Sequence, residues 1–544
     1  MRTLLLGAVV LAGSALAVDG NGQKFYPDDP IWRDPETQNA SKVKPRDLSE
    51  QYDFIENTFL DAGDQTSRRA VNVNTVDEVP DSSWFTNRIG RDALTAEALA
   101  SGPDQGVGPR PGPWTIVAGK SEGITPGLTI RDTAGDIYFI KFDPPDYPEM
   151  ASGAEVVSTK FFHAFGYNVP ENYLASVRRD DLVLNPDTEI EDEEGRPHRM
   201  QARDLDDLLD LAARHPDGTY RVLASKALPG RPVGPFRYYG TRPDDPNDIH
   251  PHEHRRELRG LSVFAAWLNH DDSRAINTLD VLVPGRGEGS IVRHYLLDFG
   301  STLGSGSTRA QTTRAGNEYI WEARPTLVTM LTLGFYVRPW VKVPYPDIPS
   351  VGRFEWTYFR PENWKPEYPN AAFQNARPED RFWAARILSR LSDDDVRTVV
   401  ETARYGDSRA TDYVTETLLA RKAKVLLEWL NGTNPVINVS IDDSGRMRFD
   451  NAAVQAAVAK PADHYTINWS RFDNITHVHT PVGPEQTVTT TFAPMPQELR
   501  PDPFISATIK AFGQDHPEWQ HPLIVYFRRA PGAGWTLVGL ERNP

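Results

Sequence analysis

The sequence predicts an α+β protein in which an extended N-terminal arm precedes a β-rich segment, a helical segment and a C-terminal β-sandwich-like domain. Short apolar runs with glycine-containing turns, typical of strands, begin near residue 111 and give way after residue 250 to apolar residues at helical spacing. Strand-like runs return after residue 431. We therefore divide the chain into residues 18–110, 111–250, 251–430 and 431–544, after a targeting segment at 1–17.

The composition excludes several classes of function. The 544 residues are 39% hydrophobic and 25% charged, which is typical of folded globular domains. The absence of cysteine excludes disulfides, thiolate metal sites and cysteine nucleophiles. A formal net charge of -16 argues against a general nucleic-acid binder and against attraction of the whole molecule to an anionic membrane.

The first segment has the pattern of a signal peptide. Met1 and Arg2 precede an apolar run over residues 4–12, and Ala15-Leu16-Ala17 follows as a small-residue cleavage site. The run is too short to span a bilayer. We therefore expect an exported bacterial protein, periplasmic or extracellular, with no membrane span after cleavage.

Residues 18–110 are rich in proline, aspartate and asparagine, with one expected helix at 48–60, and read as an arm wrapped on a later domain. Glycines and prolines at 102–113 form a linker. The β-rich segment that follows contains one helix, which carries Val156, Phe161 and Phe165 on one side and ends at Gly166. The expected strands are 114–118, 128–131, 137–142, 169–177 and 220–227. The acidic stretch 179–194 between the last two is interpreted as a solvated hairpin rather than a metal site.

The helical segment begins with a helix at 254–270, whose Leu261, Phe264 and Leu268 form one buried face. A hairpin is expected at 279–283 and 291–297, and Ser392 is the expected N-cap of a late helix. Late helices are expected at 379–391, 394–403 and 410–430, and C-terminal strands at 436–441, 486–492, 523–529 and 535–540.

One group of residues suggests chemistry. A polar loop after the first of these helices carries Asp271, Asp272 and Asn277, and the hairpin then delivers Asp298 to a turn with Phe299-Gly300. Two carboxylates and an amide brought to one place suit Mg²⁺, which prefers a few protein oxygens together with phosphate oxygens.

A second group lies upstream. Lys141 stands alone in an apolar strand, and Glu155 follows near the start of the next helix. A buried lysine needs a partner, since an unpaired buried charge is costly. Taken alone, the pair is better explained by an ordinary structural ion pair, or by a lysine on the solvent face, than by a functional site.

Together these residues resemble the protein-kinase-like fold over residues 114–430. In that fold an aspartate is followed five positions later by an asparagine, then by a short hairpin and Asp-Phe-Gly, and Asp272, Asn277 and Asp298 have this order. The resemblance is closest to the atypical branch, which includes the HipA-type toxin kinases, phosphatidylinositol kinases, spore-coat kinases and secretory-pathway kinases. It implies a two-lobed domain, with a β-rich N-lobe at 111–250 and a helical C-lobe at 251–430.

The resemblance also implies roles. Asp272 would orient or deprotonate the acceptor hydroxyl, Asn277 and Asp298 would hold Mg²⁺ or Mn²⁺, and Lys141, held by Glu155, would bind the phosphates of ATP. A phosphate-covering loop would contain Gly119, Lys120, Ser121 and Gly123, and the segment 224–228 with Lys226 would lie against adenine. The sequence has Asn-His-Asp-Asp at 269–272 where kinases have His-Arg-Asp, so Asp271 competes with Asp272.

The expected function is therefore an exported kinase-like enzyme that transfers a phosphoryl, or a nucleotidyl, group from ATP–Mg²⁺ to a protein or glycan acceptor. The alternatives are an inactive pseudokinase-like scaffold and a cell-envelope protein that binds carbohydrate or peptide. His250, His252 and His254 alternate and suit a transition metal, but a polar loop leading into the helix is the favoured interpretation. The aromatic residues of 335–368 suit a sugar or peptide groove, with core packing as the default interpretation.

Overall fold

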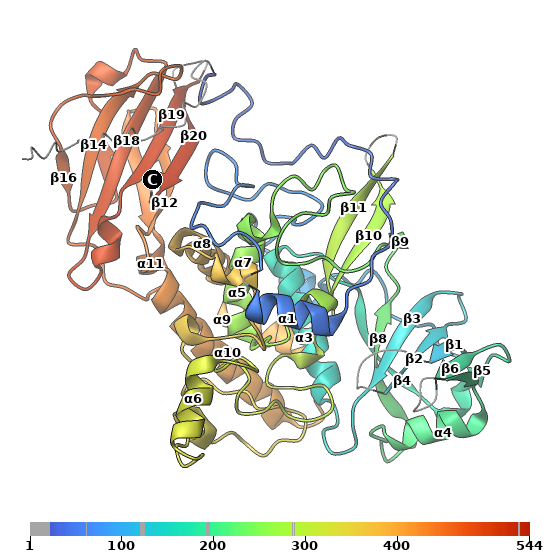
Figure 1. The fold of residues 1–544 in the computed structure, drawn as a ribbon. Helices are drawn as coiled ribbons and strands as arrows, with labels where there is room; N and C mark the ends of the chain where they lie inside the picture. Colours follow the sequence, from blue (N-terminus) through green and yellow to red (C-terminus); the bar gives the residue numbers. More distant parts are fainter. Residues whose placement is uncertain are drawn as a thin grey trace, which may run out of the picture.

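The structure, a computed structural model, describes residues 22–60, 62–119, 126–191, 196–285, 287, 289–530, 532 and 534–543. It is a mixed α+β protein with several sheets (Figure 1). The predicted signal peptide and Lys120, Ser121 and Gly123 of the predicted phosphate loop lie outside the described residues.

The β-rich segment forms a six-stranded sheet of order β4-β8-β3-β2-β1-β5. Neighbouring strands are antiparallel, except that β5 joins β1 in parallel. Alternation along β3 buries Tyr138, Ile140 and Phe142 in a core that Leu205 and Leu209 of helix α4 (Ala202–Asp210) complete. Lys141 therefore faces the other side of the sheet. The strands are β1 (Trp114–Gly119), β2 (Gly127–Arg131), β3 (Ile137–Phe142), β4 (Asn172–Val177), β5 (Leu182–Leu184) and β8 (Tyr220–Lys226), with a separate hairpin of β6 (Glu189–Glu191) and β7 (Pro197–Arg199).

Helix α3 (Met150–Phe165) connects β3 to β4 and is buried over nearly its whole length. It ends at Gly166, as expected, where φ is 120°. A Cβ at this position would lie 2.3 Å from the ring of Phe85, so only glycine fits.

The helical segment packs around α5 (Arg256–Leu268), which is buried on nearly all sides between α8 (Pro378–Leu388) and α10 (Ser408–Trp429). Two arginines inside this bundle, Arg256 and Arg259, pair with Asp380 of α8 at 3.0 and 3.1 Å, and none of the three side chains is exposed. Ser392 caps α9 (Asp393–Glu401) by accepting from the Asp395 amide, as expected. The other elements are α6 (Ala323–Leu331), α7 (Ala371–Gln374), and a sheet of β9 (Arg231–Pro232), β10 (Thr278–Pro284) and β11 (Ser290–Leu296).

The N-terminal arm crosses the molecule from the C-terminal domain to the β-rich segment (Figure 1). Phe25 packs against Phe472 and Tyr526 of the C-terminal sheet, and Trp84 stacks on His294 of β11 with ring centroids 3.5 Å apart. The arm carries α1 (Glu50–Phe59) and α2 (Ala96–Ser101). It is therefore wrapped on later parts of the chain, as expected.

The C-terminal domain has two sheets, of order β12-β13-β17 and β15-β14-β18-β19-β20, whose apolar side chains join one core. The single strand expected at 486–492 is wrong. The chain forms β16 (Gln486–Val488) on β14, crosses over, and forms β17 (Phe492–Pro494) on β13, because neither sheet alone accommodates the whole run. The remaining elements are β12 (Val436–Ile441), β13 (Arg446–Asn451), α11 (Ala452–Gln455), β14 (His464–Phe472), β15 (His479–Pro481), β18 (Phe504–Phe512), β19 (Leu523–Arg529) and β20 (Trp535–Arg542). No helix among the described residues has both the length and the apolar character needed to cross a membrane.

Asp380→Ala should lower the free energy of unfolding by about 3–5 kcal/mol, because it leaves Arg259 buried without a carboxylate and leaves Arg256 with Asp77 alone. Urea denaturation followed by tryptophan fluorescence measures this change. Asp412→Ala is the control, since its ion pair with Arg397 leaves 65% of the aspartate side chain exposed, and we expect a loss below about 1 kcal/mol. Equal losses in the two variants would contradict the assignment.

Candidate active site

Lys141 is the centre of an ion cluster on the face of β3 opposite its apolar core. Its Nζ donates to Asp298 Oδ1 at 2.8 Å and to Glu155 Oε2 at 3.3 Å. Burial lowers the pKa of Lys141, but the carboxylates of Asp298 and Glu155 outweigh it, and the net pKa is raised. The lysine therefore stays charged.

Glu155 joins this cluster to the turn that follows β11. Its side chain is 3% exposed, and its second oxygen accepts from the Phe299 amide at 3.0 Å. Burial raises the pKa of Glu155, and Lys141 acts against this rise. A Cβ at Gly300 would lie 3.2 Å from Glu155 Oε2, so a small residue permits this close approach.

Asp298 lies just after β11, with φ of 55° in the left-handed region. This conformation turns the chain sharply into a short 3₁₀ helix, Phe299–Ser301, and leaves the aspartate side chain 44% exposed beside Lys141. The Asp298 carboxylate thus contacts Lys141 and is also accessible to solvent.

The loop 269–277 reaches the same place from α5. Asn269 ends the helix in the left-handed conformation, and Asn277 Nδ2 donates to the Asp272 carbonyl at 2.8 Å. The Leu297 amide donates to the Asn277 carbonyl at 2.9 Å, which fixes the loop against the residue preceding Asp298. The predicted Asp272, Asn277 and Asp298 are thus brought to one end of the β10–β11 hairpin.

The two neighbouring aspartates have different surroundings. Asp271 is buried and accepts from Gln311 Nε2 at 2.5 Å, and burial, reinforced by Glu367, raises its pKa well above the usual value. Asp272 forms an ion pair with Arg274 and is 15% exposed. Burial raises the pKa of Asp272 to about 7 against the opposing charge of Arg274.

His270 belongs to a buried aromatic stack rather than to a proton-transfer site. Phe162 of α3 stacks on Phe299 with centroids 4.8 Å apart, and the His270 ring lies 5.7 Å from Phe299. Burial lowers the pKa of His270 to about 4, so the ring is neutral at pH 7. Phe162 and Phe299 were expected on the apolar side of the helix and in the turn after the hairpin, but their packing with His270 was not predicted, because no motif links the three rings.

A small cavity of about 10 Å³ lies beside the ion cluster. Its far wall contains Asp143, whose carboxylate accepts from the Ser152 amide at 2.9 Å, and Arg221 Nε donates to Ser152 Oγ at 2.9 Å. Ser152 and Asp143 were not predicted, because no motif identifies them. Lys141, Glu155, Asp298 and Gly300 form the near wall.

Lys226 is not brought to the cluster, contrary to its predicted role in nucleotide binding. It lies opposite Tyr138 in the register of β8 with β3, which places it on the other face of the sheet from Lys141. Its Nζ instead pairs with Asp136 at 3.0 Å. Gly119 ends β1, where a Cβ would lie 2.5 Å from Ile190 Cγ2, so packing against the β6 hairpin already requires glycine there.

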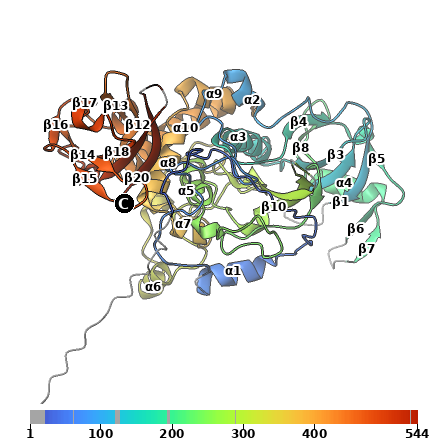
Figure 2. The same ribbon diagram turned by 90° about the horizontal axis from the view of Figure 1, so that it is seen from above.

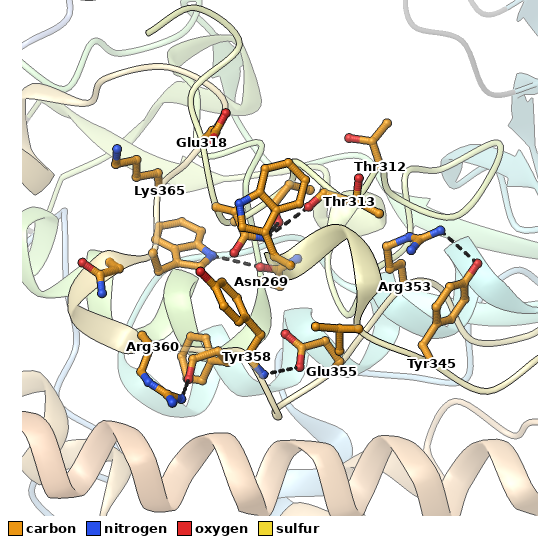
Figure 3. A pocket seen from close by; sticks show the side chains of 18 of the residues that line it. Asn269, Thr312, Thr313, Glu318, Tyr345, Arg353, Glu355, Tyr358, Arg360 and Lys365 are labelled. Carbon is orange, nitrogen blue, oxygen red and sulfur yellow. Dashed lines mark hydrogen bonds between the residues drawn. The ribbon is translucent and has the colours of Figure 1, made fainter. Parts of the chain in front are cut away.

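A larger cavity, of about 290 Å³, lies next to Asn269 (Figure 3). Asn269 forms part of its wall and accepts from Trp364 Nε1 at 2.9 Å. Arg353 stacks on Tyr345 with its guanidinium carbon 4.3 Å from the ring centroid. The aromatic residues of 335–368 have different surroundings. Phe354, Phe359 and Tyr368 are buried, and Phe335, Tyr336 and Trp356 are exposed. Trp340, Tyr345, Tyr358 and Trp364 line the cavity together with Phe359.

The alternating histidines are occupied by structural hydrogen bonds. His252 Nε2 contacts Asp248 at 2.7 Å, and His254 lies between Asp64 and Arg259. Among the described residues, no three His, Asp or Glu side chains come together in a way that could hold a metal ion.

The raised pKa of Asp272 makes stability depend on pH. Between the ordinary value of 3.8 and about 7 the native state binds a proton that the unfolded chain releases, so this residue's contribution to stability falls as pH rises. Asp272→Asn removes the effect, and its melting temperature relative to wild type should rise from pH 5 to pH 8, by about 1 °C per kcal/mol for a chain of this length. The exposed Asp412→Asn is the control, and a pH-independent difference for Asp272→Asn would contradict the environment described.

Models of known protein families do not match this chain, and none of the curated proteins is significantly similar to it. What the protein does must therefore be inferred from the residues that converge around Lys141.

Proposed function

We propose that the protein is an exported kinase-like enzyme that transfers a phosphoryl, or a nucleotidyl, group from ATP–Mg²⁺ to a protein or glycan hydroxyl. The observation that carries the proposal is the contact of Lys141 with both Glu155 and Asp298, three residues from separate elements. A strand lysine held by a helix glutamate beside the aspartate of Asp-Phe-Gly is the arrangement that such enzymes use to position phosphates.

The topology supports a two-lobed, kinase-like arrangement. Within the sheet the strands lie in the order β1-β2-β3-β8-β4. Along the chain, helix α3 connects β3 to β4, and a helical segment follows the last strand of the sheet. The ion cluster lies where these two parts of the chain meet, since Lys141 belongs to the sheet and Asp298 to the helical segment.

The residues present fit a nucleotide with a divalent cation. The accessible carboxylate of Asp298 and the amide of Asn277 are hard oxygen donors, which Mg²⁺ or Mn²⁺ prefers, and the cation would neutralise phosphate charge. Lys141 would contact phosphate oxygens. Phe139 lies on the same face of β3 as Lys141 and is 51% exposed, so it offers a flat surface for a base.

Asp272 is suited to act on the acceptor. A carboxylate with a pKa of about 7 can take up a proton near neutral pH, so it would accept the proton of the acceptor hydroxyl as that oxygen attacks the terminal phosphorus. Asp271 is less suited, because Gln311 already binds its carboxylate. The larger cavity next to Asn269, with its aromatic and polar walls, is the site proposed for the acceptor.

A pseudokinase-like scaffold is the second candidate, and one observation favours it. The cavity beside Lys141 measures about 10 Å³, which is far less than the roughly 300–1,000 Å³ of common ligand sites. In that case the ion cluster would only hold the sheet, α3 and the hairpin together.

Nucleotide binding separates these candidates. ATP with Mg²⁺ or Mn²⁺ should raise the melting temperature of the wild type. At a nucleotide concentration 100 times Kd, binding adds about 2.7 kcal/mol to the free energy of unfolding. In the Asp298→Asn variant, adding the divalent cation to ATP should no longer raise the melting temperature. Lys226→Met is the matched control, because Lys226 pairs with Asp136 on the other face of the sheet, and it should retain the shift. A wild type that does not respond favours the scaffold, and an undiminished response of Asp298→Asn rules out the site.

Asp272→Asn should lower the rate of phosphoryl transfer by about 100-fold or more while the nucleotide-dependent thermal shift persists, because only the proton acceptor is removed. Release of phosphate from ATP, which measures transfer to water, is the assay. Asp271→Asn should instead lower the melting temperature and change the rate little. The reverse outcome would assign the role to Asp271.

A further inference from the structure

Apolar side chains gather on one face of the molecule, formed by α1 and the residues around α6. Leu331, Leu333 and Phe335 are 75%, 84% and 86% exposed. The two helices lie on the same side of the molecule (Figure 2), and Phe59 of α1 contacts Trp321 with ring centroids 4.9 Å apart. We call this the α1–α6 face and define it by Ile55, Phe59, Trp321, Leu331, Leu333 and Phe335.

Helix α1 is inverted relative to an ordinary surface helix, which turns its apolar side inward. Its acidic residues face the protein, where Glu50 pairs with Arg274, Asp53 accepts from Tyr368, and Glu56 pairs with Arg237 at 3.4 Å. Ile55 and Phe59 are left outside, 45% and 49% exposed. Phe54 packs inward on Tyr368 with ring centroids 5.6 Å apart, so only part of the apolar surface of α1 is covered within this chain.

The residues around α6 protrude and carry positive charge. None of the residues of α6 is buried. Residues 323–346 contain no aspartate or glutamate and three cations, Arg324, Arg338 and Lys342, in a chain of net charge -16. Arg338 is paired with Glu318, whereas Lys342 is exposed.

These features fit a lipid bilayer better than a second copy of the chain. Single side chains that are more than three-quarters exposed project outward and enter a fluid phase more readily than they form a flat, self-complementary contact. The local cations complement anionic headgroups, and the negative charge elsewhere is screened beyond about 10 Å at 0.1 M salt.

We infer that the α1–α6 face docks on the surface of an anionic phospholipid bilayer. Leu331, Leu333 and Phe335 insert at the boundary between headgroups and acyl chains, and Arg324 and Lys342 contact the lipid phosphates. This docking does not depend on phosphoryl transfer. Because Glu50 of α1 pairs with Arg274, the loop that carries Asp272 lies directly behind the docked helix.

Flotation with phospholipid vesicles tests the inference. The intact protein should float with phosphatidylcholine vesicles containing about a quarter phosphatidylglycerol, and less with pure phosphatidylcholine or at high salt. The double variant Leu333→Asp/Phe335→Asp should lower vesicle partitioning by about tenfold or more with an unchanged melting temperature. Val107→Asp/Leu211→Asp is the matched control, since these residues are also exposed, at 79% and 61%, but belong to the β-rich part of the molecule.

Three outcomes would overturn the inference. They are a wild type that binds neither kind of vesicle, a double variant that binds as well as the control, and a wild-type dimer in light scattering that Leu333→Asp/Phe335→Asp converts to a monomer. The last would identify the face as a contact between copies. Asp298→Asn should bind vesicles normally, so a failure of the proposed phosphotransfer does not affect this test.

Discussion

A buried lysine that must be paired determines much of this architecture. Lys141 projects from the middle strands of the sheet, and its charge is tolerated only because Glu155 and Asp298 lie within 3.3 Å. The glutamate requires α3 to pack with one particular face toward the sheet, and the aspartate requires the β10–β11 hairpin to end at the same point. Three elements that are distant in sequence are thus fixed relative to one another by two ion pairs and one backbone hydrogen bond to Phe299.

Asp271 and Asp272 are adjacent in the sequence, but their carboxylates have different surroundings and different chemistry. Asn269 ends α5 in the left-handed conformation, and in the loop that follows Asp271 is buried whereas Asp272 is 15% exposed. Asp271 consequently meets Gln311, whereas Asp272 meets Arg274 and feels the charge of Asp298. Burial raises both pKa values, but only Asp272 combines a value of about 7 with a partly exposed side chain. The helix end, rather than the residue types, creates this difference.

The sequence predicts those features that depend on residues close together in the chain, and fails for those that depend on distant partners. The strand 137–142, the capping by Ser392 and the helix end at Gly166 depend on neighbours within a few residues, and these predictions are confirmed. The face that Lys226 occupies depends on the register between β8 and β3, and the split of 486–492 depends on two different partner strands. Gln311 and Arg274 were missed because they carry no motif and reach the site only through the tertiary fold. The convergence of Lys141, Glu155 and Asp298 was expected only from the order of their motifs.

The path of the N-terminal arm has a consequence for the order in which the chain can fold. Lys24 pairs with Glu541 at 2.6 Å, and Phe25 packs on Tyr526, more than 500 positions away. During synthesis these first residues have no partner until the last two strands have left the ribosome. The sheet and the helical bundle, whose contacts are more local, therefore assemble before the arm closes over them. A chain that loses its last strands therefore also loses the contacts that hold the beginning of the arm.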